Sequence, residues 1–140
     1  MTENYKIIGN FIKDMSSETP DTPTHIFVRD KISKYRLNID INSKAIKNGI
    51  IEVNTIIKFS DQPEILKKAH FEITYTSIVK VDEKVSDKKE MEKIILCDVP
   101  NKIYPDLERI FLNLLTDSGY PGIKFEKKIN FTELYKQRAN

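Results

Sequence analysis

The spacing of apolar side chains changes its period late in this chain of 140 residues. Residues 35–42, 51–59 and 70–81 alternate apolar with polar side chains, which is typical of strands with one buried face. Residues 104–115 instead repeat apolar side chains at intervals of three and four, which is typical of an amphipathic helix. Because the strand patterns all precede the helical one, the sequence predicts an α+β fold.

A further strand is expected over residues 5–16, and Asn48-Gly49 predicts a tight hairpin turn between two of the alternating segments. The expected sheet has four antiparallel strands, with a long first crossover followed by a meander. All of residues 1–140 are expected to form a single domain, because a chain of this length suits one hydrophobic core.

The long helix is expected over residues 102–117. Asn101 is the predicted N-cap, and Pro105 falls in the predicted first turn, where a proline costs little hydrogen bonding. Gly119 and Pro121 then end the helix.

Two shorter helices are also expected. Asn130 with Glu133 resembles a capping box, which predicts a C-terminal helix that ends near residue 138. A short helix over residues 87–96 would begin after Ser86 as its cap.

Acidic side chains gather where the first strand ends. Asp14, Ser16 and Glu18 are spaced to share one face of an extended chain. The other face would carry Lys13, Met15 and Ser17. Pro20 and Pro23 cannot donate to a strand ladder, so the chain is expected to leave the sheet there and enter a loop. On spacing alone, an ordinary solvated strand end explains the two carboxylates.

Composition and spacing argue against several classes of function. The 23 basic and 21 acidic residues leave a net charge of +2 and alternate along the chain, which does not favour nucleic-acid binding. His25, His70 and Cys97 are too far apart in sequence to suggest a zinc site, and there is no glycine-rich phosphate loop. We therefore expect no enzyme activity, no cofactor and no metal.

The chain has one cysteine, no apolar run long enough to span a bilayer, and no basic start followed by an apolar core. A cytoplasmic protein without membrane insertion is expected. Both faces of the predicted sheet carry aliphatic side chains, for example Ile56 and Ile78 opposite the helix-facing residues. Such surplus apolar surface favours oligomerisation or a binding groove, although a thick core would explain it equally well.

Four motifs resemble one known family. Residues 11–23 read Phe-Ile-Lys-Asp-Met-Ser-Ser-Glu-Thr-Pro-Asp-Thr-Pro, which is similar to the first-strand signature of SecB, the bacterial protein-export chaperone family. Residues 99–105, 117–121 and 129–135 read Val-Pro-Asn-Lys-Ile-Tyr-Pro, Asp-Ser-Gly-Tyr-Pro and Ile-Asn-Phe-Thr-Glu-Leu-Tyr. These resemble, at the family's spacing, the beginning and end of its main helix and the beginning of its last helix.

The resemblance implies an ATP-independent holdase that keeps preproteins unfolded and delivers them to SecA. It implies a homotetramer, a dimer of dimers, with the helix over 102–117 at the dimer–dimer interface through Ile110, Phe111 and Leu114. Clients would bind in apolar grooves. The resemblance assigns six side chains to the groove walls: Phe27, Phe59, Ile103, Phe131, Leu134 and Tyr135. An ordinary core role for these six remains equally open.

The resemblance also places the contact with SecA on the outer face of the sheet, at Asp14, Glu18 and Glu72. The partner there would be a small, basic, zinc-bound tail, so binding should weaken with salt.

The chain departs from the family in several places, which leaves alternatives open. Thr76-Ser77 stands where the family has Gly-Gly, His70 replaces an aliphatic residue, and a charged connector occupies 84–93. One alternative is a SecB-like chaperone dedicated to an antitoxin or another single labile partner. The other is an oligomeric structural or small-ligand-binding domain without chaperone activity, which would bind no extended apolar-basic peptide.

Overall fold

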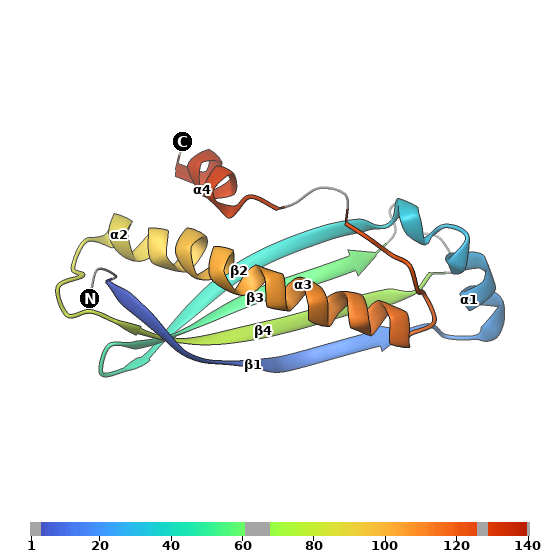
Figure 1. Cartoon of the computed structure of the whole chain (residues 1–140), viewed down its shortest axis with the longest axis horizontal. Helices are drawn as coiled ribbons and strands as arrows, with labels where there is room; N and C mark the ends of the chain where they lie inside the picture. Colours follow the sequence, from blue (N-terminus) through green and yellow to red (C-terminus); the bar gives the residue numbers. More distant parts are fainter. Residues whose placement is uncertain (1–3, 61–67, 126–128, 140) are drawn as a thin grey trace.

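A computed structural model of the chain describes residues 4–60, 68–125 and 129–139. It contains an antiparallel sheet of four strands, and a long helix crosses one face of that sheet (Figure 1). The strands are β1 (Tyr5–Glu18), β2 (Arg36–Lys47), β3 (Ile50–Ser60) and β4 (His70–Val81). The helices are α1 (Thr22–Arg29), α2 (Lys88–Lys93), α3 (Val99–Asp117) and α4 (Phe131–Ala139), with a 3₁₀ turn at Ile32–Lys34 and a π-helical turn at Ile94–Asp98. The predicted α+β fold is confirmed.

The strands lie in the order β1-β4-β3-β2. β2, β3 and β4 form the expected meander, and β1 pairs antiparallel with β4. The hairpin between β2 and β3 turns at Asn48 and Gly49, whose φ angles are 56° and 76°. Positive φ at both turn residues matches the right-handed twist of the strands, which is why Asn-Gly predicts this turn.

The first crossover contains a helix that the sequence analysis did not predict. Asp21 is the N-cap of α1, and its carboxylate accepts a hydrogen bond from the Thr24 amide at 2.8 Å. Pro23 lies in the first turn of α1, where a missing N–H leaves no hydrogen bond unmade. The expectation that Pro23 opens a loop is therefore wrong, because the same proline is compatible with a helix start.

The long helix begins earlier than expected. α2, the π-helical turn and α3 follow one another without a break from residue 88 to residue 117. Asn101 is therefore inside the helix and is not its N-cap, and Pro105 is an internal proline rather than a first-turn one. The cap of the whole helix is Asp87 rather than Ser86, since the Asp87 carboxylate accepts a hydrogen bond from the Lys89 amide at 3.1 Å.

The core lies between α3 and the face of the sheet that it covers, here called the inner face. α3 buries Ile103, Leu107, Phe111 and Leu115 there, at the helical spacing seen in the sequence. The inner face contributes side chains at alternate positions of β3 and β4, among them Ile57, Phe59, Phe71 and Ile73. The opposite face, here called the outer face, carries the alternate residues of the same strands.

The exit from α3 is shaped by Gly119, which adopts a φ of 97°. A Cβ at this position would lie 2.6 Å from Nε2 of His25, so a side chain could not fit without moving His25. His25 Nε2 and the Gly119 carbonyl are 3.0 Å apart, which ties α1 to the end of α3. From this point the C-terminal segment returns along β2 toward α4 (Figure 1).

Candidate functional site

The three carboxylates assigned to SecA binding lie on the outer face at one end of the sheet. Glu72 on β4 is the register partner of Ser16 on β1, and Asp14 and Glu18 are two residues to either side of Ser16. Residues at this spacing on adjacent strands project from the same face, with diagonal Cα separations of about 7–8 Å. The structure therefore brings Asp14, Glu18 and Glu72 together, as the resemblance implies. Asp14 and Glu18 are exposed, and the side chain of Glu72 is 27% exposed.

Two neighbours of this cluster follow from the strand register. The resemblance already implied that His70 lies beside the site, whereas Lys58 was not identified from the sequence. Lys58 on β3 is the register partner of Glu72, and its Nζ lies 3.4 Å from the carboxylate. His70 on β4 is the register partner of Glu18. Among the residues that the structure describes, the cluster therefore has three carboxylates, one paired cation and one neighbouring imidazole. The alternating pattern of β3 predicts that Lys58 lies on the outer face. Its pairing with Glu72, however, can be recognised only once the register of β3 against β4 is known.

Lys13 lies on the outer face, contrary to the sequence prediction. The register of β1 against β4 shifts between Ile12 and Asp14, so Lys13 occupies a β-bulge. Its Nζ lies 3.0 Å from the Glu52 carboxylate on β3.

Glu52 belongs to a row of hydrogen bonds across the outer face, here called the polar seam. Asn54 donates to Asn42 of β2 at 2.8 Å and to Glu52 at 3.1 Å, and Thr76 of β4 donates to Asn54 at 2.7 Å. Thr76 is fully buried although it lies on this face. Thr76, which stands where the SecB family has a glycine, therefore has a defined hydrogen-bond partner in Asn54. The hydrogen bonds from Asn54 and Lys13 hold the pKa of Glu52 below its usual value.

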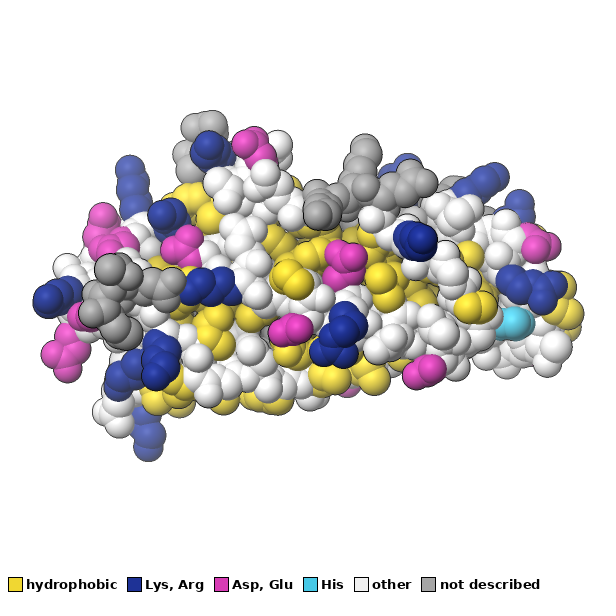
Figure 2. Space-filling view, in the orientation of Figure 1, with side chains coloured by type: hydrophobic (Ala, Val, Ile, Leu, Met, Phe, Trp, Pro, Cys, Tyr) yellow, Lys and Arg dark blue, Asp and Glu magenta, His cyan; other side chains and the backbone are white. Residues whose placement is uncertain are grey.

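A groove follows the edge strand β2 and is here called the β2 groove. Its larger part, of about 1060 Å³, lies between residues 36–38 of β2 and the returning chain at Gly122–Phe125 and Ile129. Its smaller part, of about 310 Å³, lies between residues 39–41 of β2 and α4. Figure 2 shows apolar side chains gathered along the middle of the face that carries α3.

The backbone of β2 contributes to this groove. β2 is at the edge of the sheet, and among the described strands it pairs with β3 alone. The Ile41 amide donates to the carboxylate of the preceding Asp40 at 3.0 Å, so its N–H faces away from β3. Because strand amides alternate in direction, the amides of Leu37 and Ile39 face the same side.

Of the six side chains assigned to a client groove, four line the β2 groove: Phe59 in the larger part, and Phe131, Leu134 and Tyr135 in the smaller part. Leu134 is 45% exposed, whereas Phe59 and Phe131 are almost fully buried and form the groove floor. The other two do not line it. Phe27 is half-buried on α1 with Lys31 Nζ 5.5 Å above its ring, and Ile103 is buried in the core.

α4 is anchored at its first turn. The ring of Phe131 is buried against Tyr104, with centroids 5.5 Å apart. Thr132 Oγ1 lies 3.4 Å from Cys97 Sγ in the π-helical turn and accepts a hydrogen bond from Asn101 at 3.2 Å. Asn130 caps the helix as predicted, since its side chain accepts a hydrogen bond from the Glu133 amide at 3.1 Å.

The three side chains assigned to a subunit interface differ in exposure. Ile110 and Leu114 are half-buried, so each offers surface to a partner. Phe111 is fully buried and packs edge-on against Phe59, with centroids 6.1 Å apart. Other apolar surface lies along the edge strand β1, where four large side chains are more than two fifths exposed: Ile8 (51%), Phe11 (44%), Ile12 (43%) and Met15 (46%).

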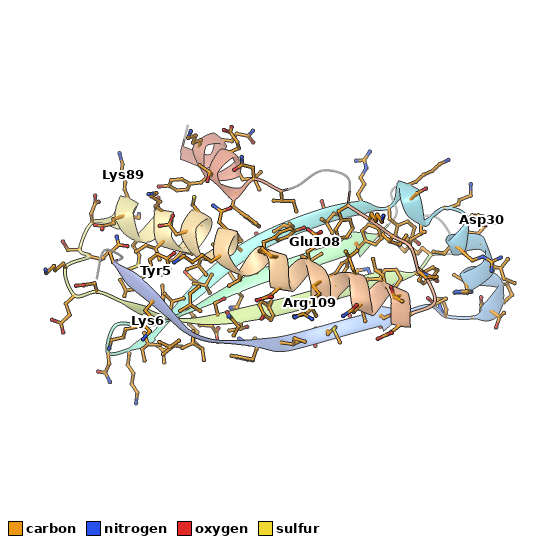
Figure 3. The ribbon with its side chains drawn as sticks, viewed as in Figure 1. Tyr5, Lys6, Asp30, Lys89, Glu108 and Arg109 are labelled. Carbon is orange, nitrogen blue, oxygen red and sulfur yellow. The ribbon has the colours of Figure 1, made fainter. Side chains whose placement is uncertain are left out.

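Ionisable groups along α3 show shifts that burial explains. Burial raises the pKa of the Tyr104 hydroxyl, and the negative charge of Glu108 adds to this effect. Burial also raises the pKa of Tyr75, with a smaller contribution from Asp106. Figure 3 shows Glu108 on the side of α3 toward β2 and Arg109 on the side toward β1. Both tyrosines stay neutral at physiological pH and act as packing residues.

The described part of the chain holds no group of three or more His, Cys, Asp or Glu side chains arranged for a metal ion. None of the helices in residues 4–60, 68–125 and 129–139 is long and apolar enough to cross a membrane. The geometry thus comprises a charged cluster on the outer face and an apolar groove beside β2.

Comparisons with known proteins agree on one family. The family model of SecB, described as preprotein translocase subunit SecB, matches residues 1–140. The chain is 96% identical over 140 residues, which is all of both chains, to a protein of Pelagibacter ubique described as "Putative protein-export protein SecB". It is 23% identical over 130 residues to the protein-export protein SecB of Methylocella silvestris, covering 93% of this chain and 79% of that protein.

A solved structure has the same fold. It is the SecB-like chaperone Rv1957 of Mycobacterium tuberculosis in complex with a ChAD peptide from the Rv1956 HigA1 antitoxin. The two chains superpose with a TM-score of 0.67 at 12% identity, over 89% of this chain and 91% of that one. With a family match over its whole length and a relative of near-identical sequence, the chain belongs to the SecB family of protein-export chaperones.

Proposed function

We propose that this protein is an ATP-independent holdase of the cytoplasm that keeps preproteins unfolded in the β2 groove and delivers them to SecA through the outer-face carboxylates. The observation that carries the proposal is the groove itself. It combines an apolar floor, at Phe59 and Phe131, with an edge of β2 that no other described strand covers. Family membership and the SecB-like fold support chaperone activity of this kind.

The groove suits extended polypeptide rather than a folded partner. A client strand lying beside β2 would receive backbone hydrogen bonds from the outward-facing amides, which carry no sequence information. Apolar pockets on either side would accept alternate side chains, which suits many sequences. Binding only the unfolded client shifts its folding equilibrium toward the unfolded state, so no ATP is required.

A homotetramer, arranged as a dimer of dimers, would strengthen such binding. Several weak grooves on one particle bind a single long client with greater avidity than one groove does. Ile110 and Leu114 on α3 remain the proposed interface residues, because both leave part of their side chains exposed. The exposed apolar side chains of β1 support self-association, since a monomer would leave them in water.

SecA docking is proposed at Asp14, Glu18 and Glu72. None of the three carboxylates lines the β2 groove, so a client and SecA could bind at the same time. Because Asp14 and Glu18 are exposed, they would act mainly by long-range attraction of a basic tail, which salt screens.

The test measures two activities of the same variants. The purified protein should delay the refolding of a slow-folding preprotein without ATP. Asp14→Ala combined with Glu18→Ala should weaken binding of the zinc-loaded SecA tail while leaving the refolding delay unchanged. As the matched control, Asp30→Ala with Glu83→Ala removes two exposed carboxylates elsewhere and should change neither activity. Unchanged tail binding in the first double variant would show that the docking site is wrong, and absence of any refolding delay would show that the protein is not a holdase.

A chaperone dedicated to one labile partner is the second candidate. Support comes from the fold shared with the SecB-like chaperone solved with an antitoxin peptide. A dedicated chaperone would delay aggregation of one partner and leave unrelated preproteins unaffected. The refolding assay with several unrelated preproteins therefore separates the two candidates.

A further inference from the structure

The hairpin end of the sheet carries a row of lysines on its outer face. The strand register places four residues side by side across the sheet, here called the lysine row: Lys47 of β2, Ile50 of β3, Lys80 of β4 and Lys6 of β1. The residues on either side of Lys80 are buried in an apolar cluster with residues 94 and 99, so Lys80 and its register partners face outward. All three lysines are exposed. Figure 2 shows Lys and Arg side chains gathered at this end, at lower left, and Figure 3 labels Lys6 there.

The lysine row does not stabilise the sheet. Lys6 and Lys80 are register partners, and like charges directly opposite each other on adjacent strands are unfavourable. Among the described residues, no carboxylate lies within salt-bridge distance of the three lysines. Lys80 Nζ donates a hydrogen bond to the Asn48 carbonyl at 2.8 Å, which leaves its charge unbalanced. The row therefore offers positive charge to an anionic partner.

The described carboxylates close to the row along the chain do not balance it. Glu52 lies on β3 with its carboxylate 3.0 Å from Lys13 Nζ. Asp82, directly after β4, accepts a hydrogen bond from the Lys84 amide at 2.9 Å. Glu83 and Lys84 follow as one exposed charge of each sign. The described residues at the hairpin end thus carry an excess of positive charge.

An exposed aliphatic side chain lies beside the row. The register of β2 against β3 shifts between Ala45 and Lys47, so Ile46 occupies a β-bulge. Ile46 is 50% exposed. Lysines next to an exposed aliphatic side chain suit a membrane surface, where anionic headgroups cover apolar chains. A nucleic acid would favour arginine and aromatic side chains, and the lysine row contains neither.

The hairpin end is also far from the carboxylates assigned to SecA. Lys6 and Glu18 lie near opposite ends of β1, which has 14 residues and therefore spans roughly 40 Å. This span is several times the screening length of about 8 Å at physiological ionic strength. A molecule that stands on its hairpin end on an anionic surface would therefore keep its carboxylates clear of that surface.

We propose that the lysine row and Ile46 form a docking surface for bilayers that contain anionic phospholipids. The lysines attract the headgroups, Ile46 enters the interface, and the protein adsorbs end-on without spanning the bilayer. A lysine close to such a surface strengthens binding about fivefold. The inference goes beyond the proposed holdase function, since it assigns a separate surface that needs no client.

The experiment measures co-sedimentation of the full-length protein with vesicles. One set contains equal parts of phosphatidylglycerol and phosphatidylcholine, and the other contains phosphatidylcholine alone. The parent should bind the anionic set about 10-fold or more tightly than the neutral set, and salt should weaken this binding. Lys6→Gln with Lys47→Gln should weaken it about 10- to 30-fold. The matched control, Lys34→Gln with Lys136→Gln, removes two exposed lysines elsewhere and should bind like the parent.

The apolar contribution is tested separately. Ile46→Ser should weaken binding to the anionic vesicles about 3- to 10-fold at low and at high salt, because it removes apolar area that salt does not screen. Ile26→Ser on α1 is the matched control, since Ile26 is 51% exposed, and it should leave binding unchanged. Equal binding by the Ile46→Ser variant and the parent would overturn the role of Ile46.

The remaining outcomes decide the proposal as a whole. Equal binding of the parent to both vesicle sets, binding to neither, or the same loss in both lysine double variants would overturn it. Binding of a single-stranded RNA oligonucleotide that requires Lys6 and Lys47, without vesicle binding, would identify a nucleic acid as the partner instead. None of these results affects the holdase proposal, because the refolding assay contains no lipid.

Discussion

The two faces of the sheet are made by the same strands and stabilised in different ways. On the inner face, Ile57, Phe71 and Ile73 are fully buried and belong to one apolar cluster with residues of α3. On the outer face, the polar seam joins side chains from all four strands by hydrogen bonds and one ion pair. The inner face is stabilised by the burial of apolar surface, which tolerates substitutions between apolar side chains of similar volume. The outer face depends on matched hydrogen-bond donors and acceptors.

This difference assigns the two proposed partners to separate surfaces. In the proposed function, a client would be recognised by apolar area and by the edge of β2, both of which belong to the inner side and the β2 groove. SecA would be recognised by the carboxylates of the outer face. Variants that alter one face and leave the other unchanged therefore test the comparison directly.

The largest effect is expected from Phe111→Ala on the inner face. Phe111 is fully buried and contacts the rings of Phe59 and Phe125. Its loss should lower the free energy of unfolding by about 3–5 kcal/mol, because it removes buried area and leaves a cavity. Urea unfolding at a fixed chain concentration measures this. Asn113→Ala, on the exposed side of α3, is the control and should cost nothing.

A smaller loss is expected from Thr76→Val on the outer face. Valine keeps the shape of threonine but removes the hydroxyl that donates to Asn54, and the site is fully buried. The expected loss in free energy of unfolding is about 1–3 kcal/mol, since a buried acceptor loses its partner. Thr74→Val, at a half-buried site of the same face, is the matched control. An equal effect at both positions would show that the polar seam does not stabilise the sheet.

A functional effect is expected from Lys58→Ala. The lysine offsets the charge of Glu72, so its removal should strengthen binding of the SecA tail by about 2- to 5-fold at low salt. Isothermal titration at two salt concentrations measures the change, with Lys47→Ala as the control. Client-peptide binding should not change, because Lys58 lies on the face opposite the groove floor. Weaker tail binding after this substitution would contradict the proposed electrostatics.

The smallest effect is expected from Glu52→Gln and depends on pH. The pKa of Glu52 is lower in the folded protein than in the unfolded chain, where it is about 4.3. The contribution of the Glu52 carboxylate to the free energy of unfolding is therefore fully present above that unfolded value and is lost as the pH falls through the folded pKa. Acidification should therefore destabilise the parent more than the variant, by at most about 1 kcal/mol. Thermal unfolding of both proteins from neutral to acidic pH measures the difference. If the thermal stability of both proteins depended on pH in the same way, the Glu52 carboxylate would not stabilise the fold.

The sequence was sufficient for the features that depend on local pattern. Alternation located three of the strands, Asn48-Gly49 located the hairpin, and the helical repeat located the buried face of α3. The resemblance to SecB brought Asp14, Glu18 and Glu72 to one place, and the register confirms their proximity. These features need only short-range rules or a known family.

The remaining features depend on tertiary structure. The sequence analysis interpreted Pro23 as the start of a loop and Pro105 as a first-turn residue. Both interpretations were wrong, because a proline alone does not show where a helix begins. Lys13 changed faces through a bulge, which alternation cannot detect. The β2 groove lies between residues 36–38 and residues 122–125, and only the return of the chain along β2 brings two segments so distant in sequence together.

The attachment of α4 has a consequence for how the protein moves. One buried ring, Phe131, and a few side-chain hydrogen bonds hold this helix, whereas α3 has seven buried residues along its length. α4 should therefore open locally at a free energy far below that of global unfolding, and its amides should exchange with deuterium well before those of α3. One wall of the smaller part of the β2 groove would then widen and close on its own, so a client could enter from the side without any rearrangement of the sheet.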